Sequence, residues 1–210
     1  MVLTIEKLTI IPLIKLWVKK AAGLENLPRK GAAILAANHS SYADHLIIGS
    51  YVATKANRKF HFLAKKEYFQ GIQKLWYVHE GAIPIDRQKG GKEALRLALR
   101  ALRQDKLIVI YPVGTRSLTG KLQKAKTGVA RLALQSKAPV IPIGLVGTFD
   151  ILPKGKYLPR MKKAELNIGK PMRFPQHYDK KINKRRVNKV TVNIMKEIAK
   201  LSKQKYNFRH

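Results

Sequence analysis

Residues 32–53 read AAILAANHSSYADHLIIGSYVA, and this stretch decides the fold expected for the chain. Its first six residues are small and apolar, which predicts a short buried strand, and the apolar residues from Leu46 onward predict a helix. His39 and Asp44 lie five positions apart, where the strand gives way to the helix. Because side chains at this spacing do not stack on a regular helix, they meet only if His39 lies in the turn and Asp44 in the first helical turn.

This arrangement is suited to acid–base chemistry. A carboxylate beside an imidazole accepts a hydrogen bond from one ring nitrogen, fixes the tautomer and leaves the other nitrogen free to take a proton. The chain has no cysteine, so the nucleophile would be a substrate hydroxyl, water or a serine such as Ser40. A structural histidine or an Asp helix cap explains the same spacing. His45 is a second-choice base, whereas His61 and His79 are interpreted as strand or loop residues.

Composition narrows the class of protein. The chain has 210 residues, of which 45% are hydrophobic, as expected for one globular domain. Its formal net charge is +31, from 43 Lys and Arg against 12 Asp and Glu. Such a charge attracts nucleic acid, anionic lipid or an acidic carrier protein, and composition alone does not choose among them.

The N-terminal segment is expected to be a separate membrane-surface helix over residues 1–22. Its apolar run, residues 8–18, is too short to span a bilayer and contains Pro12 and Lys15. A tryptophan and lysines bordering leucines and isoleucines are typical of a monotopic helix lying in the interface. The alternative is a first helix packed on the domain.

Residues 23–210 are expected to form a single α/β domain, with a mixed, largely parallel sheet flanked by helices. The predicted later strands are 60–64, 81–87, 107–111 and 139–146, with an edge strand at 165–169. The predicted later helices are 66–77, 93–104, 126–135 and 184–203. The aromatic residues of 66–77 are interpreted as core, with an acyl groove as the alternative.

Residues 112–117, which read PVGTRS, follow the clearest buried strand and indicate an anion site. Gly114 permits close backbone approach, Thr115 supplies a hydroxyl, and Arg116 offers a planar guanidinium. Lys126 precedes a predicted helix, whose N-terminus also favours anions. Arg87 ends another predicted strand, where an α/β sheet presents side chains to a ligand.

Four blocks in this order resemble the phospholipid/glycerol acyltransferase family, in its 1-acylglycerol-3-phosphate acyltransferase branch. The family's N-H-x4-D is matched by Asn38, His39 and Asp44, and its G-x-I-P-I-D-R by residues 81–87. Its F-P-E-G-T-R-S becomes YPVGTRS at residues 111–117, and its V-I-P-I is matched at 140–143. The resemblance covers roughly residues 23–150.

The resemblance implies an enzyme in which His39, oriented by Asp44, takes the proton from the sn-2 hydroxyl of a lysophosphatidate. That oxygen then attacks the thioester of acyl-CoA or acyl-carrier protein, which is a co-substrate, and neither cofactor nor metal is expected. By the same resemblance, the glycerol phosphate is held by Arg87, Gly114, Thr115, Arg116 and Lys126.

One position departs from the family: Val113 stands where the family carries Glu, and an isopropyl group accepts no hydrogen bond. The expectation is an active enzyme that is slower or shifted in its acceptor. Glycerol-3-phosphate, another lysophospholipid or a lyso-aminolipid are the alternative acceptors. A non-catalytic module that binds anionic membranes or nucleic acid is the alternative of another class.

The expected location is the cytoplasmic face of the cell membrane, as a peripheral or monotopic protein. The expected partners are an anionic membrane surface, a lysophospholipid and the acyl donor. No recognition-helix, base-stacking or zinc motif supports specific binding of nucleic acid.

Overall fold

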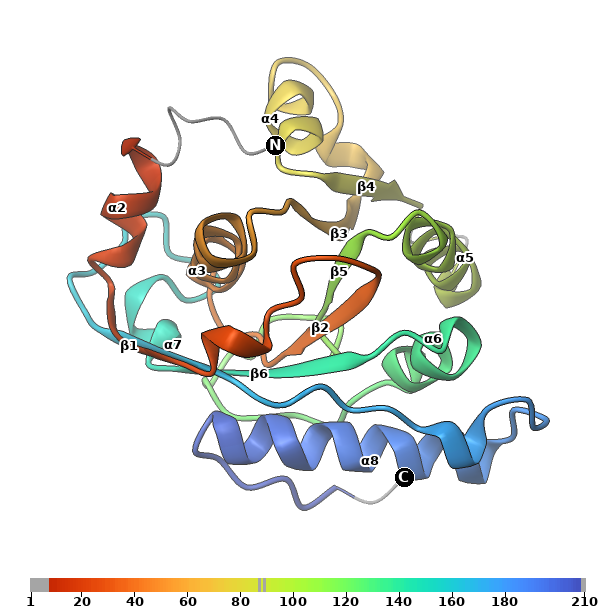
Figure 1. Cartoon of the computed structure of the whole chain (residues 1–210). Helices are drawn as coiled ribbons and strands as arrows, with labels where there is room; N and C mark the ends of the chain where they lie inside the picture. The colour runs from red at the N-terminus through yellow and green to blue at the C-terminus, as the bar shows by residue number, and fades with distance from the viewer. Residues whose placement is uncertain (1–7, 87, 89, 209–210) are drawn as a thin grey trace.

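The computed structural model describes residues 8–86, 88 and 90–208 (Figure 1). Seven strands form one sheet in the order β1-β7-β6-β2-β5-β3-β4. The strands are β1 (Val18–Ala22), β2 (Ala33–Ala37), β3 (Phe60–Lys65), β4 (Ala82–Ile85), β5 (Leu107–Ile110), β6 (Val140–Val146) and β7 (Ala164–Ile168). All neighbouring pairs are parallel except β6 with β7. The prediction of a mixed, largely parallel sheet flanked by helices is confirmed.

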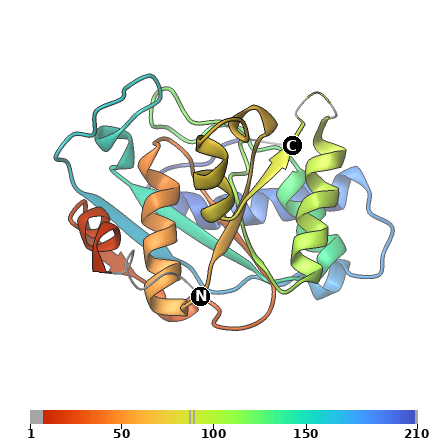
Figure 2. The same cartoon turned by 90° about the horizontal axis from the view of Figure 1, so that it is seen from above.

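Helices cover both faces of the sheet (Figure 1). One face carries α2 (Ile10–Lys15), α3 (Ala43–Tyr51) and α7 (Thr148–Ile151), and the other carries α5 (Gly90–Arg103), α6 (Gly128–Ser136) and α8 (Lys184–Leu201). A short helix, α4 (Gln73–His79), lies between α3 and α5 in Figure 2, near β4. A π-helix, Val52–Ala56, extends α3, and 3-10 helices occupy Leu24–Asn26, Lys66–Tyr68 and Pro175–His177.

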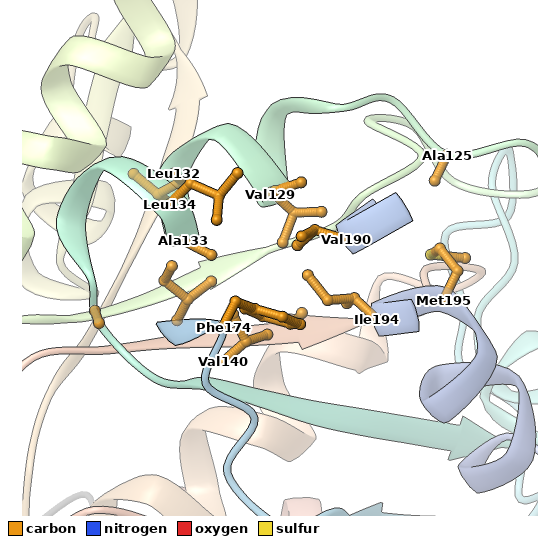
Figure 3. Packing of buried hydrophobic residues seen from close by; sticks show 14 of the residues in the cluster. Ala125, Val129, Leu132, Ala133, Leu134, Val140, Phe174, Val190, Ile194 and Met195 are labelled. Atoms are coloured by element: carbon orange, nitrogen blue, oxygen red, sulfur yellow. The ribbon is translucent and has the colours of Figure 1, made fainter. Parts of the chain in front are cut away.

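The core is built on β2, which lies in the middle of the sheet and buries all five of its residues. A continuous apolar run is what a strand covered on both faces requires. Ile34 and Ala36 pack toward α5, α6 and α8, whereas Leu35 packs toward α3. Figure 3 shows the first of these layers, in which Val129 of α6 and Val190 of α8 pack in the cluster that includes Val140.

The N-terminal segment differs from its prediction. Residues 1–7 lie outside the described residues, so the predicted membrane-surface helix over 1–22 stays a prediction there. Within the described residues α2 is short, and Val18–Ala22 is a strand of the sheet instead of a helix. The strand forms because it pairs in parallel with β7, and Lys19 at this edge forms an ion pair with Glu165. No helix in the described part of the chain is long and apolar enough to cross a membrane.

Two further expectations are corrected. The strand predicted at 165–169 is not an edge strand, because β1 covers its outer side. The helix predicted over 66–77 is divided into the 3-10 helix Lys66–Tyr68 and α4, and α4 has no buried residue. Its aromatic side chains are therefore not core, and Trp76 is 45% exposed.

Close packing of β6 on the end of α8 yields a stability prediction. A Cβ atom added at Gly144 would lie 2.2 Å from the carbonyl carbon of Leu201, so Gly144→Ala forces strand and helix apart. We expect a loss of about 1–3 kcal/mol in the free energy of unfolding, measured by urea denaturation. Gly91→Ala in α5 is the control, because a Cβ there meets nothing within 4 Å. Equal stability of the two variants would contradict the packing.

Candidate active site

The predicted contact between His39 and Asp44 is present at the carboxyl end of β2. His39 Nδ1 lies 2.7 Å from Asp44 Oδ2. The carboxylate is fully buried in the first turn of α3, and the same oxygen accepts hydrogen bonds from the backbone N–H groups of Ser40 (2.7 Å) and Ser41 (2.8 Å). Because an ionised carboxylate only accepts hydrogen bonds, it holds a proton on Nδ1 and leaves Nε2 of the neutral ring as an acceptor.

The imidazole is also held from one face by an aromatic ring. Tyr111 directly follows β5, and its ring stacks on His39 with centroids 3.8 Å apart and planes 13° from parallel. Burial, and secondarily the Asp44 carboxylate, raises the pKa of Tyr111 well above its usual value, so the phenol stays neutral. The His39 side chain remains 15% exposed. The sequence pattern alone did not indicate this role for Tyr111, although the residue directly precedes the PVGTRS turn.

Hydrogen bonds from distant segments fix the histidine turn. The Asn38 side chain donates to the backbone O of Leu145 and accepts from its N–H, both at 2.8 Å, which ties the turn to β6. The Ser117 N–H donates to the His39 carbonyl at 2.8 Å, so the first and third blocks are joined directly. The turn therefore has little freedom to rotate the imidazole away from Asp44.

The third block forms a turn lined by cations. Gly114 adopts a φ of 81°, which favours glycine, and its N–H donates to Tyr111 O at 2.9 Å. The side chain of Lys126 runs alongside, since a Cβ on Gly114 would lie 3.7 Å from Lys126 Nζ. Gly114 and Thr115 are exposed, so the turn presents backbone and hydroxyl groups to solvent.

Arg116 reaches toward the histidine turn. Its guanidinium lies 3.5 Å from the ring centroid of Tyr42, over the ring face. Its Nη1 is buried and has no hydrogen-bond partner among the described residues. Such a donor is suited to an anionic oxygen of a ligand.

Six of the seven predicted site residues lie within the described part of the chain. His39 contacts Asp44, the Ser117 N–H joins the turn that contains Gly114, Thr115 and Arg116 to the His39 carbonyl, and Lys126 lies beside Gly114. Arg87 lies outside the described residues. Its neighbour Asp86 is bound by Lys66 at 2.6 Å.

Two hollows lie near the histidine turn, one lined by His39 and the other by His45. A small cavity, with Val113 and Ser117 in its wall, adjoins His39 itself. A larger groove, with a volume of about 130 Å³, lies between α2, α3 and α4. Its wall includes Ile14, Leu46 and Trp76, and His45 also lines it.

His45 is a poor competitor for the role of base. Burial, followed by the charge of His39, lowers its pKa from 6.5 to about 4, against the opposing effect of Asp44. Its ring tilts against Phe62 with centroids 5.7 Å apart. His45 is therefore neutral near pH 7 and binds a proton weakly.

Comparisons with known proteins match this arrangement to a family. The sequence model described as "Acyltransferase" matches residues 19–146. The chain belongs to the acyltransferase family. It is 30% identical to the 1-acyl-sn-glycerol-3-phosphate acyltransferase of Bacillus subtilis (strain 168) over an alignment of 156 residues. This alignment covers 73% of each of the two chains.

Other relatives agree with the family assignment. The chloroplastic 1-acyl-sn-glycerol-3-phosphate acyltransferase LPAT1 of Arabidopsis thaliana is 30% identical over 137 residues, which are 63% of this chain and only 37% of that protein. The crystal structure of the 1-acyl-sn-glycerophosphate acyltransferase PlsC from Thermotoga maritima superposes with a TM-score of 0.70 at 24% identity, over 96% of this chain and 83% of the other. The latter supports the α/β fold.

The lowered pKa of His45 yields a pH prediction. The folded state binds a proton at His45 less readily than the unfolded state, so its contribution to stability is present above about pH 6.5 and is lost as the pH falls toward 4. We expect the His45 ring resonances in NMR spectra to stay unchanged between pH 8 and pH 5.5. A titration midpoint above pH 6 would contradict the burial argument.

Proposed function

We propose that this acyltransferase moves a fatty acyl group from acyl-CoA or acyl-carrier protein to the sn-2 hydroxyl of 1-acylglycerol-3-phosphate, giving phosphatidic acid. The observation that carries the proposal is the His39–Asp44 contact beside the cationic turn of Gly114, Arg116 and Lys126. A base for a hydroxyl and donors for a phosphate are the two elements that such an acceptor needs. The names of the relatives from Bacillus and Arabidopsis support the acceptor.

The reaction proceeds by direct transfer. His39 Nε2 removes the proton of the sn-2 hydroxyl as its oxygen attacks the thioester carbonyl carbon, and Asp44 stabilises the imidazolium that forms. The tetrahedral intermediate collapses, the C–S bond breaks, and the imidazolium returns its proton to the departing thiolate. Activation by a base is required because an alcohol is a weak nucleophile at neutral pH.

The acceptor phosphate is assigned to the cationic turn. Arg116 contributes the buried Nη1 that lacks a partner among the described residues, and Lys126 adds a second positive charge beside Gly114. Thr115 offers a hydroxyl, and Arg87 is retained in this role on the basis of its sequence block alone. The groove of α2, α3 and α4 is assigned to an acyl chain, because its lining is mainly apolar.

We also propose that the enzyme acts at the cytoplasmic face of the membrane. α2 buries Ile11 and Ile14 but exposes Ile10 (56%) and Leu13 (64%), with Leu16 also exposed. A helix with this exposed apolar face, on a strongly basic protein, is suited to an anionic bilayer surface.

Val113 favours a second candidate. It lines the cavity beside His39 in place of the carboxylate that the family carries, so an altered acceptor or a non-catalytic, membrane-binding relative is the alternative. A panel of acceptors that tests this alternative consists of lysophosphatidate, glycerol-3-phosphate, other lysophospholipids and lyso-aminolipids.

Removal of the base tests the reaction. In liposomes containing lysophosphatidate and labelled acyl-CoA or acyl-carrier protein, we expect His39→Ala to lower kcat by about 10²–10⁴-fold. Vesicle binding, measured by sedimentation, stays unchanged because the side chain is largely enclosed. His177→Gln is the control and keeps most of the activity, because His177 lines neither the cavity beside His39 nor the groove assigned to the acyl chain. Substantial turnover by His39→Ala would rule out the mechanism.

Restoration of the family carboxylate tests the departure at Val113. We expect the native protein to form phosphatidic acid, and Val113→Glu to retain that activity while changing kcat/KM between the acceptors of the panel. Val113→Gln, of similar size but uncharged, is the control for volume. An inactive native protein that gains turnover only as Val113→Glu would identify a degenerate enzyme.

A further inference from the structure

The segment between α7 and β7, residues 153–163, exposes an unusual set of side chains and is called the wedge loop here. Tyr157 is 91% exposed, Leu158 83% and Met161 80%. The loop contains no helix or strand, and all residues from 154 to 163 are exposed. Three large apolar side chains held in solvent this way mark an interaction surface.

The charge of the wedge loop is uniform. Five of its eleven residues are cationic and none is acidic; the cations are Lys154, Lys156, Arg160, Lys162 and Lys163. Among the described residues, no carboxylate forms an ion pair with any of them. Such a loop is complementary to a surface that is both anionic and apolar below its charges, which is the character of an anionic bilayer.

The wedge loop has a defined place between the histidine turn and α2. At its start, Ser41 Oγ and the Tyr42 N–H both donate to Leu152 O, at 2.9 and 3.0 Å. At its end, Lys163 Nζ donates to the carbonyl of Leu16, the residue after α2, at 2.5 Å. In Figures 1 and 2 the loop, in cyan, projects from the side of the molecule that carries α2.

The backbone of the wedge loop suits shallow insertion. The Lys156 N–H donates to Pro153 O and the Arg160 N–H to Ile151 O, while Pro153 and Pro159 have no N–H to desolvate. Irregular backbone is not tolerated in the hydrocarbon core, so only the side chains reach below the headgroups. Tyr157 is suited to the headgroup level, where aromatic residues with a polar end gather.

We propose that the wedge loop inserts Tyr157, Leu158 and Met161 into an anionic bilayer, as a second membrane contact beside α2. The two contacts bring the lipid surface against the histidine turn, where a lysophospholipid must arrive. The inference rests on the proposed membrane location but not on the chemistry of His39. An acidic carrier protein would use the cations but offers no apolar layer for the three side chains.

The absence of native cysteine permits a direct test, because a single introduced cysteine is labelled uniquely. Leu158→Cys carries an environment-sensitive NBD fluorophore, and Lys196→Cys, exposed on α8, is the matched control. On addition of vesicles of phosphatidylcholine and phosphatidylglycerol, we expect blue-shifted, brighter emission at position 158 only. Equal shifts at both positions, no shift at 158, or a shift induced by acyl-carrier protein without vesicles would overturn the proposal.

Vesicle binding of further variants separates insertion from net charge. The triple variant Tyr157→Ser, Leu158→Ser, Met161→Ser should bind vesicles about tenfold or more weakly, and the difference should persist at 0.5 M salt, where charge attraction is screened. Neutralising Lys154, Lys156 and Arg160 to Gln should weaken binding more than the same change at Arg185, Lys189 and Lys196 of α8. Equal losses from the two neutralised sets would overturn the assignment to the loop.

Turnover is measured on the same vesicles as the fluorescence. Insertion at position 158 without formation of phosphatidic acid would contradict the proposed reaction but support the membrane contact of the wedge loop. Formation of phosphatidic acid while the fluorophore at position 158 stays in water would support the reaction and contradict the membrane contact of the wedge loop.

Discussion

The site depends on the desolvated carboxylate of Asp44. One oxygen of this buried group accepts from two backbone N–H groups and from the imidazole of His39. The other oxygen, Oδ1, is buried without a hydrogen-bond partner among the described residues, so the contacts to Oδ2 are the ones that offset the cost of burying this carboxylate. The same contacts orient the imidazole of His39, so the stability of the turn and the orientation of this ring depend on one set of hydrogen bonds.

The sheet supplies the remaining geometry. β2 and β5 are adjacent and parallel, so the segments that follow them meet at the carboxyl ends of the two strands. These segments are the histidine turn and the third family block, residues 111–117. This adjacency brings Tyr111 against His39 and allows the Ser117 N–H to reach the His39 carbonyl. The cationic side chain of Arg116 is thereby brought near the histidine turn by the pairing of two strands that are far apart in the sequence.

Several large apolar side chains are not buried in the core but exposed to solvent. α2 and the wedge loop keep large side chains in solvent although the protein has a well-filled interior on both faces of its sheet. Folding leaves these side chains exposed within the described chain, and this exposure motivates the proposed contact with a lipid surface. The net charge of +31 would strengthen the attraction of the protein to an anionic surface of this kind.

The sequence by itself determined the α/β class, the buried strands β2, β5 and β6, and the contact of His39 with Asp44, because hydrophobic patterns and a five-residue spacing act over short range. It could not assign Val18–Ala22 to the sheet, since an edge strand exists only through its pairing with β7. The sequence likewise did not indicate that the Tyr111 ring stacks on His39 or that Lys126 lies against Gly114. Nor did it indicate that the aromatic residues of α4 lie outside the core. These features arise from contacts between segments far apart in the chain, and only the tertiary structure decides which distant segments meet.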